Sequence, residues 1–217
     1  MPVRRIGLCY RSVSGRVPMG GGRPSVSVES TLERDFVLLR RFDPEVAAIE
    51  EQPVRVEYPS GGILRAYIPD FLVFYRDSVR QPELVEVKPA SDPGLRSGLL
   101  KERLAAARDF AARRGWVFLL ATEREIRTPR LGNATFLLPY RDRAVAPNLR
   151  ELLLMAAGAE GATVQKVTDD VARTLKGDPR WVLPAVWTLI ARFEIVADLD
   201  RPVSMRSPLQ IPAEAFP

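Results

Sequence analysis

The spacing of hydrophobic residues along the chain changes from helical to strand-like and back to helical. Between residues 30 and 42, apolar side chains recur on one helical face at Leu32, Phe36 and Leu39. Ser30 and Glu33 have the spacing of a capping box at the start of this segment, and an Asp-Pro pair follows it at residue 43. The pattern therefore predicts a helix over residues 30–42.

The pattern becomes strand-like from residue 52 onward. Strands are predicted at residues 54–58, 63–68, 70–75, 83–88 and 116–122, with a helix at residues 97–114. A Pro-Ser-Gly-Gly sequence between the first two strands indicates a hairpin. The strand at 70–75 is apolar on both faces after its first residue, as central strands are. A helix, a group of strands, a second helix and a further strand together predict a mixed α/β core.

The composition changes again at Pro147. Three short helices are predicted at residues 148–157, 163–175 and 179–193, and residues 195–197 begin a small hairpin. Three helices and a wing are typical of a winged-helix-like domain. The glycine- and arginine-containing start of the chain shows little periodicity. We therefore divide the chain into a flexible basic arm (residues 1–28), a mixed α/β domain (29–147) and a winged-helix-like α domain (148–217).

Composition excludes several classes of chemistry. Cys9 is the only cysteine and the chain has no histidine, which excludes internal disulfides, cysteine–histidine zinc sites and imidazole-based triads. No apolar run approaches the roughly 18 residues of a membrane helix, and the first residues lead into no signal-peptide core. These features predict a cytoplasmic protein with no membrane partner.

The charge is unevenly distributed. Residues 1–150 hold 25 Lys+Arg against 18 Asp+Glu, and residues 151–217 hold 7 against 9. With a pI near 9.7, this balance predicts a polyanionic partner for the first part of the chain. We expect residues 151–217 to bind protein instead of DNA.

The residues that carry candidate chemistry are Asp70, which follows Pro69, and the pair Glu86 and Lys88. Side chains alternate across a strand, so Glu86 and Lys88 share one face while Val87 points to the other. A tight connection between the strands brings Asp70 beside them. Lys88 is one of only four lysines among 32 cations, and arginine does not replace a compact ammonium. The spacing matches the PD-(D/E)xK pattern of metal-dependent nucleases.

This set of residues suits phosphodiester hydrolysis. Hard oxygen ligands favour Mg²⁺, with Mn²⁺ as a substitute, and a bound cation lowers the pKa of an attacking water. The candidate catalytic residues are Glu33, Asp70, Glu86 and Lys88, and the candidate metal ligands are Asp70, Glu86, Val87 and Glu33.

Each candidate also has a purely structural interpretation. Glu33 at the edge of the helical apolar face could only complete the capping box with Ser30. Asp70 could be a turn residue, and Glu86 with Lys88 an exposed ion pair.

Several spaced segments in residues 15–145 share an order with one family. These segments are Glu29-Ser30-Thr31-Leu32-Glu33-Arg34-Asp35-Phe36, Phe42-Asp43-Pro44-Glu45-Val46, Gln52-Pro53, Tyr67-Ile68-Pro69-Asp70-Phe71 and Leu84-Val85-Glu86-Val87-Lys88-Pro89. Together they closely resemble the amino-terminal region of TnsA, the endonuclease subunit of heteromeric transposases. Leu199-Asp200-Arg201-Pro202-Val203 resembles the end of the helical second domain of that family.

The resemblance implies a restriction-endonuclease-like fold, Mg²⁺ dependence and cleavage of the 5′ strand at the ends of a transposon in bacteria. It implies double-stranded DNA, a DDE-type integrase subunit and an AAA+ ATPase regulator as partners, the last of these docked by the carboxyl-terminal domain. By the same resemblance Glu33 is the acidic residue of the first helix, Asp70 the metal-binding aspartate and Lys88 the catalytic lysine. The family varies between carboxylate and amide at the position of Glu86.

Two other functions compete with this one. A stand-alone repair or defence nuclease of the same superfamily would carry the same residues. A non-catalytic DNA-binding adaptor on a nuclease-like scaffold is opposed by the intact set of Glu33, Asp70, Glu86 and Lys88.

Overall fold

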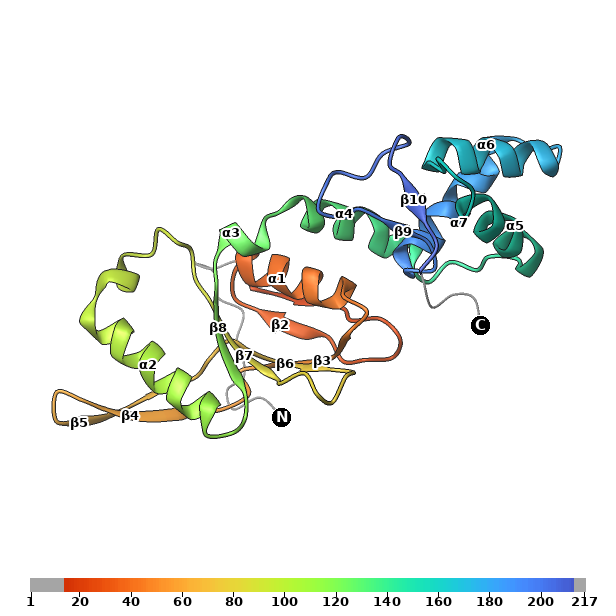
Figure 1. The fold of residues 1–217 in the computed structure, drawn as a ribbon. Coiled ribbons are helices and arrows are strands. Elements are labelled where there is room, and N and C mark those ends of the chain that lie inside the picture. The colour runs from red at the N-terminus through yellow and green to blue at the C-terminus, as the bar shows by residue number, and fades with distance from the viewer. Residues whose placement is uncertain (1–13, 213–217) are drawn as a thin grey trace. The chain divides into compact units, whose positions relative to one another are not determined.

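The structure is a computed structural model that describes residues 14–212, the side chain of Arg96 excepted. The chain forms two compact units, and the division between them falls between Arg127 and Thr128. The first unit contains a mixed sheet with helices on both faces, and the second is largely helical (Figure 1). The mixed α/β fold predicted from the sequence is confirmed, and the first unit is consistent with a restriction-endonuclease-like core. No helix in the described part of the chain is long and apolar enough to cross a membrane.

The central sheet of the first unit has the strand order β3-β6-β7-β8. Its strands are β3 (Val46–Glu51), β6 (Phe71–Tyr75), β7 (Glu83–Val87) and β8 (Val117–Ala121). β6 runs antiparallel to both β3 and β7, whereas β7 and β8 are parallel because helix α2 (Gly98–Ala112) crosses between them. The two inner strands are almost wholly buried, as their continuous apolar sequences predict.

Two helices cover opposite faces of this sheet. α1 (Thr31–Phe42) packs Leu32, Phe36 and Val37 against the residues of β6 and β7 that include Phe71 and Val85. Alternation directs the intervening residues to the other face, where Leu72 and Leu84 pack with Ala111 of α2. The predicted cap of α1 is confirmed, because the side chain of Ser30 accepts the N–H of Glu33. The side chain of Ser97 caps α2 in the same way by accepting the N–H of Leu100.

The predicted hairpin at residues 54–68 is also confirmed. β4 (Val56–Ser60) and β5 (Ile63–Tyr67) pair antiparallel as a separate two-stranded sheet. Both residues of the tip, Gly61 and Gly62, have positive φ angles of 59° and 75°, which favours glycine at each position. The base of the hairpin packs through buried side chains against α2 (Figure 1).

Two segments of the first unit differ from the sequence prediction. No strand is predicted between residues 43 and 52, where β3 forms. Its pairing with β6 supplies the order that its alanine- and glutamate-containing sequence does not. Residues 14–28, predicted as part of a flexible arm, form the hairpin of β1 (Gly15–Val17) and β2 (Val26–Val28). Val17, Val26 and Val28 are buried in the α1-side core, which accounts for that order. The remainder of the predicted arm, residues 1–13, lies outside the described residues.

The second unit begins earlier than the change of composition at Pro147. α4 (Pro129–Leu137), which follows the short helix α3 (Glu123–Ile126) of the first unit, belongs to it together with the 3₁₀ turns of Leu138–Tyr140. Asn133 of α4 donates hydrogen bonds to the carbonyls of Leu199 and Arg201 at 2.8 and 2.7 Å. These contacts connect residues far apart in sequence, so composition alone does not reveal them.

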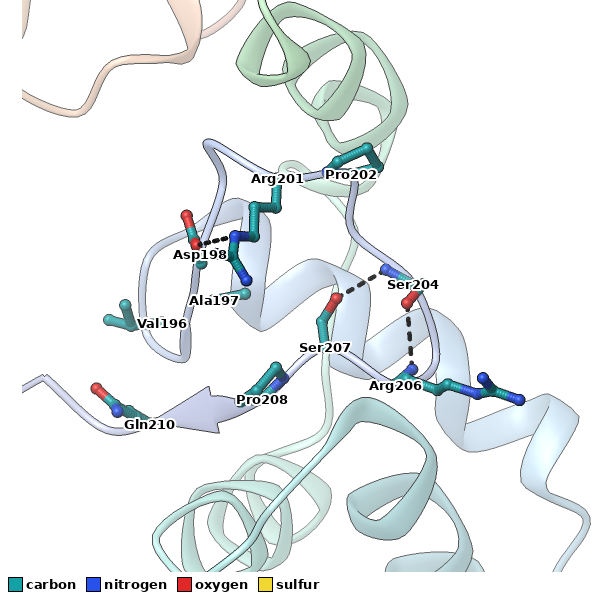
Figure 2. A pocket seen from close by; sticks show the side chains of 10 residues that line it. All are labelled: Val196, Ala197, Asp198, Arg201, Pro202, Ser204, Arg206, Ser207, Pro208 and Gln210. Carbon is teal, nitrogen blue, oxygen red and sulfur yellow. Dashed lines mark hydrogen bonds and ion pairs between the residues drawn. The ribbon is translucent and has the colours of Figure 1, made fainter.

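Three further helices of the second unit lie close to their predicted positions: α5 (Pro147–Ala157), α6 (Val164–Thr174) and α7 (Pro179–Ala191). β9 (Val196–Ala197) and β10 (Leu209–Gln210) form the predicted small hairpin. The segment between these strands surrounds a cavity of about 430 Å³ that Figure 2 shows, where Arg201 pairs with Asp198 at 3.6 Å. Residues 128–217 hold 11 Lys+Arg and 10 Asp+Glu, so the charge contrast between the units is smaller than a division at residue 150 gives.

Candidate active site

Asp70 and Glu86 are brought together by the pairing of β6 with β7. Phe71 lies opposite Val85 and Leu72 opposite Leu84, so the register, continued by one residue, places Asp70 opposite Glu86. The backbone N–H of Val87 donates to Oδ2 of Asp70 at 2.7 Å, which fixes this carboxylate against β7. Asp70 is therefore tied to the adjacent strand, which the turn-residue interpretation does not explain.

Glu86 is a buried carboxylate held by three donors. Its side chain is 2% exposed. Oε1 lies 3.0 Å from Nζ of Lys88 and 3.1 Å from a guanidinium nitrogen of Arg103, and Oε2 accepts the hydroxyl of Tyr67 at 2.9 Å. The predicted same-face pairing of Glu86 and Lys88 is thus present, and the interpretation as an exposed ion pair is wrong.

The close placement of these charges shifts their ionisation. Burial, followed by the nearby charge of Glu86, raises the pKa of Asp70 well above its ordinary value. Burial alone would lower the pKa of Lys88, but the carboxylates of Glu86 and Asp70 outweigh it, so that the pKa of Lys88 is raised. Burial and Glu86 raise the pKa of Tyr67 as well, which keeps its hydroxyl a donor. The site therefore destabilises the ionised form of Asp70 and stabilises the protonated form of Lys88.

Glu33 lies at the amino-terminal end of α1 and makes the capping contacts. Its Oε2 accepts the N–H of Glu29 at 2.7 Å, and its Oε1 accepts the hydroxyl of Ser30 at 2.9 Å. Burial raises the pKa of Glu33, and its charge interacts with that of Lys88. It also contributes to the raised pKa of Asp70. Both interpretations of Glu33 thus find support, since it caps the helix and lies within electrostatic reach of the site.

The comparison with known protein families bears on the same segment. Residues 43–123 match the family model of the TnsA-like endonuclease N-terminal domain. This part of the first unit is therefore similar to the TnsA-like endonuclease N-terminal domain. The match spans the central sheet, the hairpin β4–β5 and α2, and it includes Asp70, Glu86 and Lys88. No curated protein sequence matches the chain significantly.

Two side chains around Glu86 were not predicted from the sequence. Tyr67 lies three residues before Asp70, and Arg103 lies in the middle of α2. The guanidinium of Arg103 lies over the ring of Tyr67, with its central carbon 4.7 Å from the ring centroid. β5 shows no alternation of apolar and polar residues that would point to Tyr67. Only the packing of α2 on the hairpin brings Tyr67 and Arg103, one arginine among 28, to the site.

The residues around Asp70 and Glu86 fit a cation that needs few protein ligands. Among residues 14–212, no three or more acidic, histidine or cysteine side chains lie in a metal-holding arrangement. Glu33, Asp70 and Glu86 therefore do not form the close set of three that the sequence suggested, because the oxygens of Glu33 face the helix cap. Two carboxylates suffice for Mg²⁺, which keeps most of its waters. Asp70 fits this role, since its Oδ1 makes no hydrogen bond within the described residues.

Proposed function

We propose that the chain is a Mg²⁺-dependent DNA endonuclease that cuts the 5′ strand at transposon ends as a subunit of a heteromeric transposase. The observation that carries the proposal is the juxtaposition of Asp70, Glu86 and Lys88 within a TnsA-like endonuclease domain. Asp70 and Glu86 would hold the metal, together with the main chain of Val87. When bound, the metal would lower the pKa of the attacking water and offset charge on the phosphate.

The side chains of the site have separable roles in this mechanism. The raised pKa of Lys88 keeps its ammonium protonated at neutral pH, so Lys88 stabilises negative charge on the reacting phosphate and does not remove a proton from water. The N–H of Val87 orients Asp70, and the hydroxyl of Tyr67 orients Glu86. These groups lie where β6 begins and β7 ends, so a phosphate must reach this end of the two strands to be cleaved.

Strand-resolved cleavage of transposon-end DNA tests the proposed function. We expect Mg²⁺-dependent cleavage of the 5′ strand when the DDE-type integrase is present. The chain alone should cut poorly, because its site offers few groups for base-specific recognition. Efficient site-specific cleavage by the purified chain alone would contradict the heteromeric assignment, and an absence of cleavage in every combination would contradict the nuclease assignment.

The two interpretations of Glu33 predict different behaviour of two variants. Ser30→Ala removes the amino-terminal cap of α1 and should lower the free energy of unfolding by about 1 kcal/mol, while DNA cleavage stays within about tenfold of the wild type. Glu33→Ala removes a charge near Lys88 and the contacts of that carboxylate with Ser30 and the N–H of Glu29, while the backbone N–H of residue 33 can still donate to Ser30. We therefore expect both stability and cleavage to fall, the latter by about 10²-fold. Denaturant unfolding and cleavage assays on the two variants measure these effects. Equal cleavage by both variants would assign Glu33 to capping alone.

For the second unit we propose a role in binding the AAA+ ATPase regulator. Trp181 on α7 is 81% exposed and Met155 on α5 is 74% exposed, and large exposed apolar side chains are common anchors of protein interfaces. Trp187 on the same helix is buried, as expected of a core residue.

Trp181→Ala should weaken binding of the regulator by tenfold or more, because truncation of a central aromatic anchor typically costs more than about 1–2 kcal/mol. Arg173→Ala, at an exposed position of α6, is the control. Binding measured by calorimetry should be unchanged in the control. An unaltered affinity of the Trp181 variant would remove this residue from the interface.

A further inference from the structure

The buried carboxylate of Glu86 carries a second cation besides Lys88. Arg103 reaches it from the middle of α2, with a guanidinium nitrogen 3.1 Å from the same Oε1 that Lys88 contacts at 3.0 Å. Two positive groups thus share one carboxylate oxygen. Lys88 alone offsets the charge of Glu86, so the charge of Arg103 is left to offset that of Asp70 or of another anion.

The remaining contacts of Arg103 leave part of its donor capacity unused. Its guanidinium stacks over Tyr67, whose hydroxyl in turn donates to Oε2 of Glu86. Its Nε is buried and has no hydrogen-bond partner within residues 14–212. Burying an unpaired donor costs free energy. The contact with Glu86 therefore satisfies only part of the hydrogen-bonding capacity of the Arg103 guanidinium.

A cleft lies beside this contact. It has a volume of about 370 Å³ and is lined by Tyr58, Lys88, Arg103 and the first turn of α2. The amino-terminal end of a helix favours negative charge, and Lys88 and Arg103 add two full positive charges. The carboxylate in its lining, Asp92, accepts the N–H of Gly94 at 2.7 Å and so helps to form the adjacent turn. The lining favours an anion such as a phosphate.

We propose that Arg103 is a positioning residue that pairs with Glu86 in the metal-free protein and transfers to a DNA phosphate in the cleft, which frees Glu86 for the metal. The inference rests on the proposed nuclease function. While Arg103 and Lys88 both pair with Glu86, their charges offset those of Asp70 and Glu86, so the site attracts a divalent cation weakly. A phosphate that draws Arg103 away restores the negative field. Metal binding and DNA binding then strengthen each other, as linkage requires.

The effect of Arg103→Ala on two affinities has opposite signs under this proposal. Mg²⁺ affinity of the protein without DNA should rise about tenfold, because a positive charge leaves the site. Affinity for a duplex should fall about fivefold or more, because a phosphate contact is lost. A purely structural role of Arg103 would lower both affinities through disorder of Glu86. The opposite signs therefore separate the two explanations.

The experiment compares full-length wild type, Arg103→Ala and Arg108→Ala. Arg108 lies on the same helix, is exposed and stacks on Phe118, so its variant removes an equal charge without touching Glu86. Mg²⁺ binding is measured by calorimetry without DNA, and binding of a labelled duplex by fluorescence anisotropy in Ca²⁺. We expect Arg108→Ala to keep the Mg²⁺ affinity of the wild type.

Three outcomes would count against part or all of the scheme. Unchanged or weaker Mg²⁺ binding by Arg103→Ala, with a wild type that binds Mg²⁺, would overturn the role of Arg103 and leave the nuclease function intact. An equal gain in Arg108→Ala would overturn it too, since the effect would then come from overall charge. Absence of Mg²⁺ binding in the wild type, with and without DNA, would overturn the metal-dependent function itself.

Discussion

Asp70→Ala and Lys88→Ala should each lower DNA cleavage by at least ~10²–10³-fold while the fold stays intact. Asp70 accepts a single hydrogen bond from β7, donated by the N–H of Val87. The Lys88 ammonium pairs with Glu86 at the end of the same strand. Neither side chain belongs to the apolar core clusters around α1 and α2. Their loss therefore removes chemistry without opening a cavity in the core.

Matched controls exist on α2. Lys101 and Asp109 are exposed on that helix, so Lys101→Ala and Asp109→Ala remove the same charges away from the site. Cleavage rates of the four variants should be compared at equal Mg²⁺, with circular dichroism to verify folding. A folded Asp70 or Lys88 variant that cleaves within tenfold of the wild type would reject the assignment of the site.

The second large effect concerns stability without metal. The raised pKa of Asp70 means that the folded protein binds a proton more tightly at this group than the unfolded chain does. In EDTA, the wild type should thus lose stability as the pH rises from the ordinary aspartate value of 3.8 through the raised pKa, and keep this loss at higher pH. Asp70→Asn removes the charge with nearly the same shape, and its amide oxygen can still accept the N–H of Val87.

We therefore expect Asp70→Asn to melt higher than the wild type in EDTA at neutral pH. Two like charges ~4 Å apart repel by ~1–4 kcal/mol at effective dielectrics of ~80 to ~20, and relief of ~1 kcal/mol raises the Tm by ~2–4 °C in a chain of this size. Added Mg²⁺ should raise the Tm of the wild type at millimolar concentrations and that of the variant little. Thermal melts across pH and Mg²⁺ concentration measure both effects. If the Tm of the two proteins responded alike to pH and Mg²⁺, the charge of Asp70 would not destabilise the folded protein.

Most helices and strands of this protein can be predicted from local sequence patterns. Ser30 and Ser97 cap α1 and α2 through short-range hydrogen bonds, so their positions follow from residues only three apart. The glycines at the tip of the β4–β5 hairpin determine its turn through their backbone freedom. The pairing of Glu86 with Lys88 also follows from alternation within one strand.

The strands β1, β2 and β3 and the boundary between the units were not predicted, because long-range contacts determine them. β3 contains alanine and glutamate, and its order comes from pairing with β6. The β1–β2 hairpin encloses a glycine-rich turn, and its order comes from valines buried against α1. The boundary between the units is set by contacts such as that of Asn133 with the carbonyl of Leu199. Such long-range contacts leave no periodic signal in the sequence.

The sequence by itself determined which residue types are available for chemistry. Because the chain has no histidine and a single cysteine, carboxylates and lysine must supply its acid–base and metal-binding chemistry. It also determined that Glu86 and Lys88 share a face. It also placed Asp70 near them, provided that the connection between the strands is tight. Only the tertiary structure decided that Glu86 is buried, which strand register holds Asp70 opposite it, and that Arg103 and Tyr67 complete its surroundings. The physical reason is that burial and charge pairing depend on distances in space, which strand register and helix packing set between residues separated along the chain.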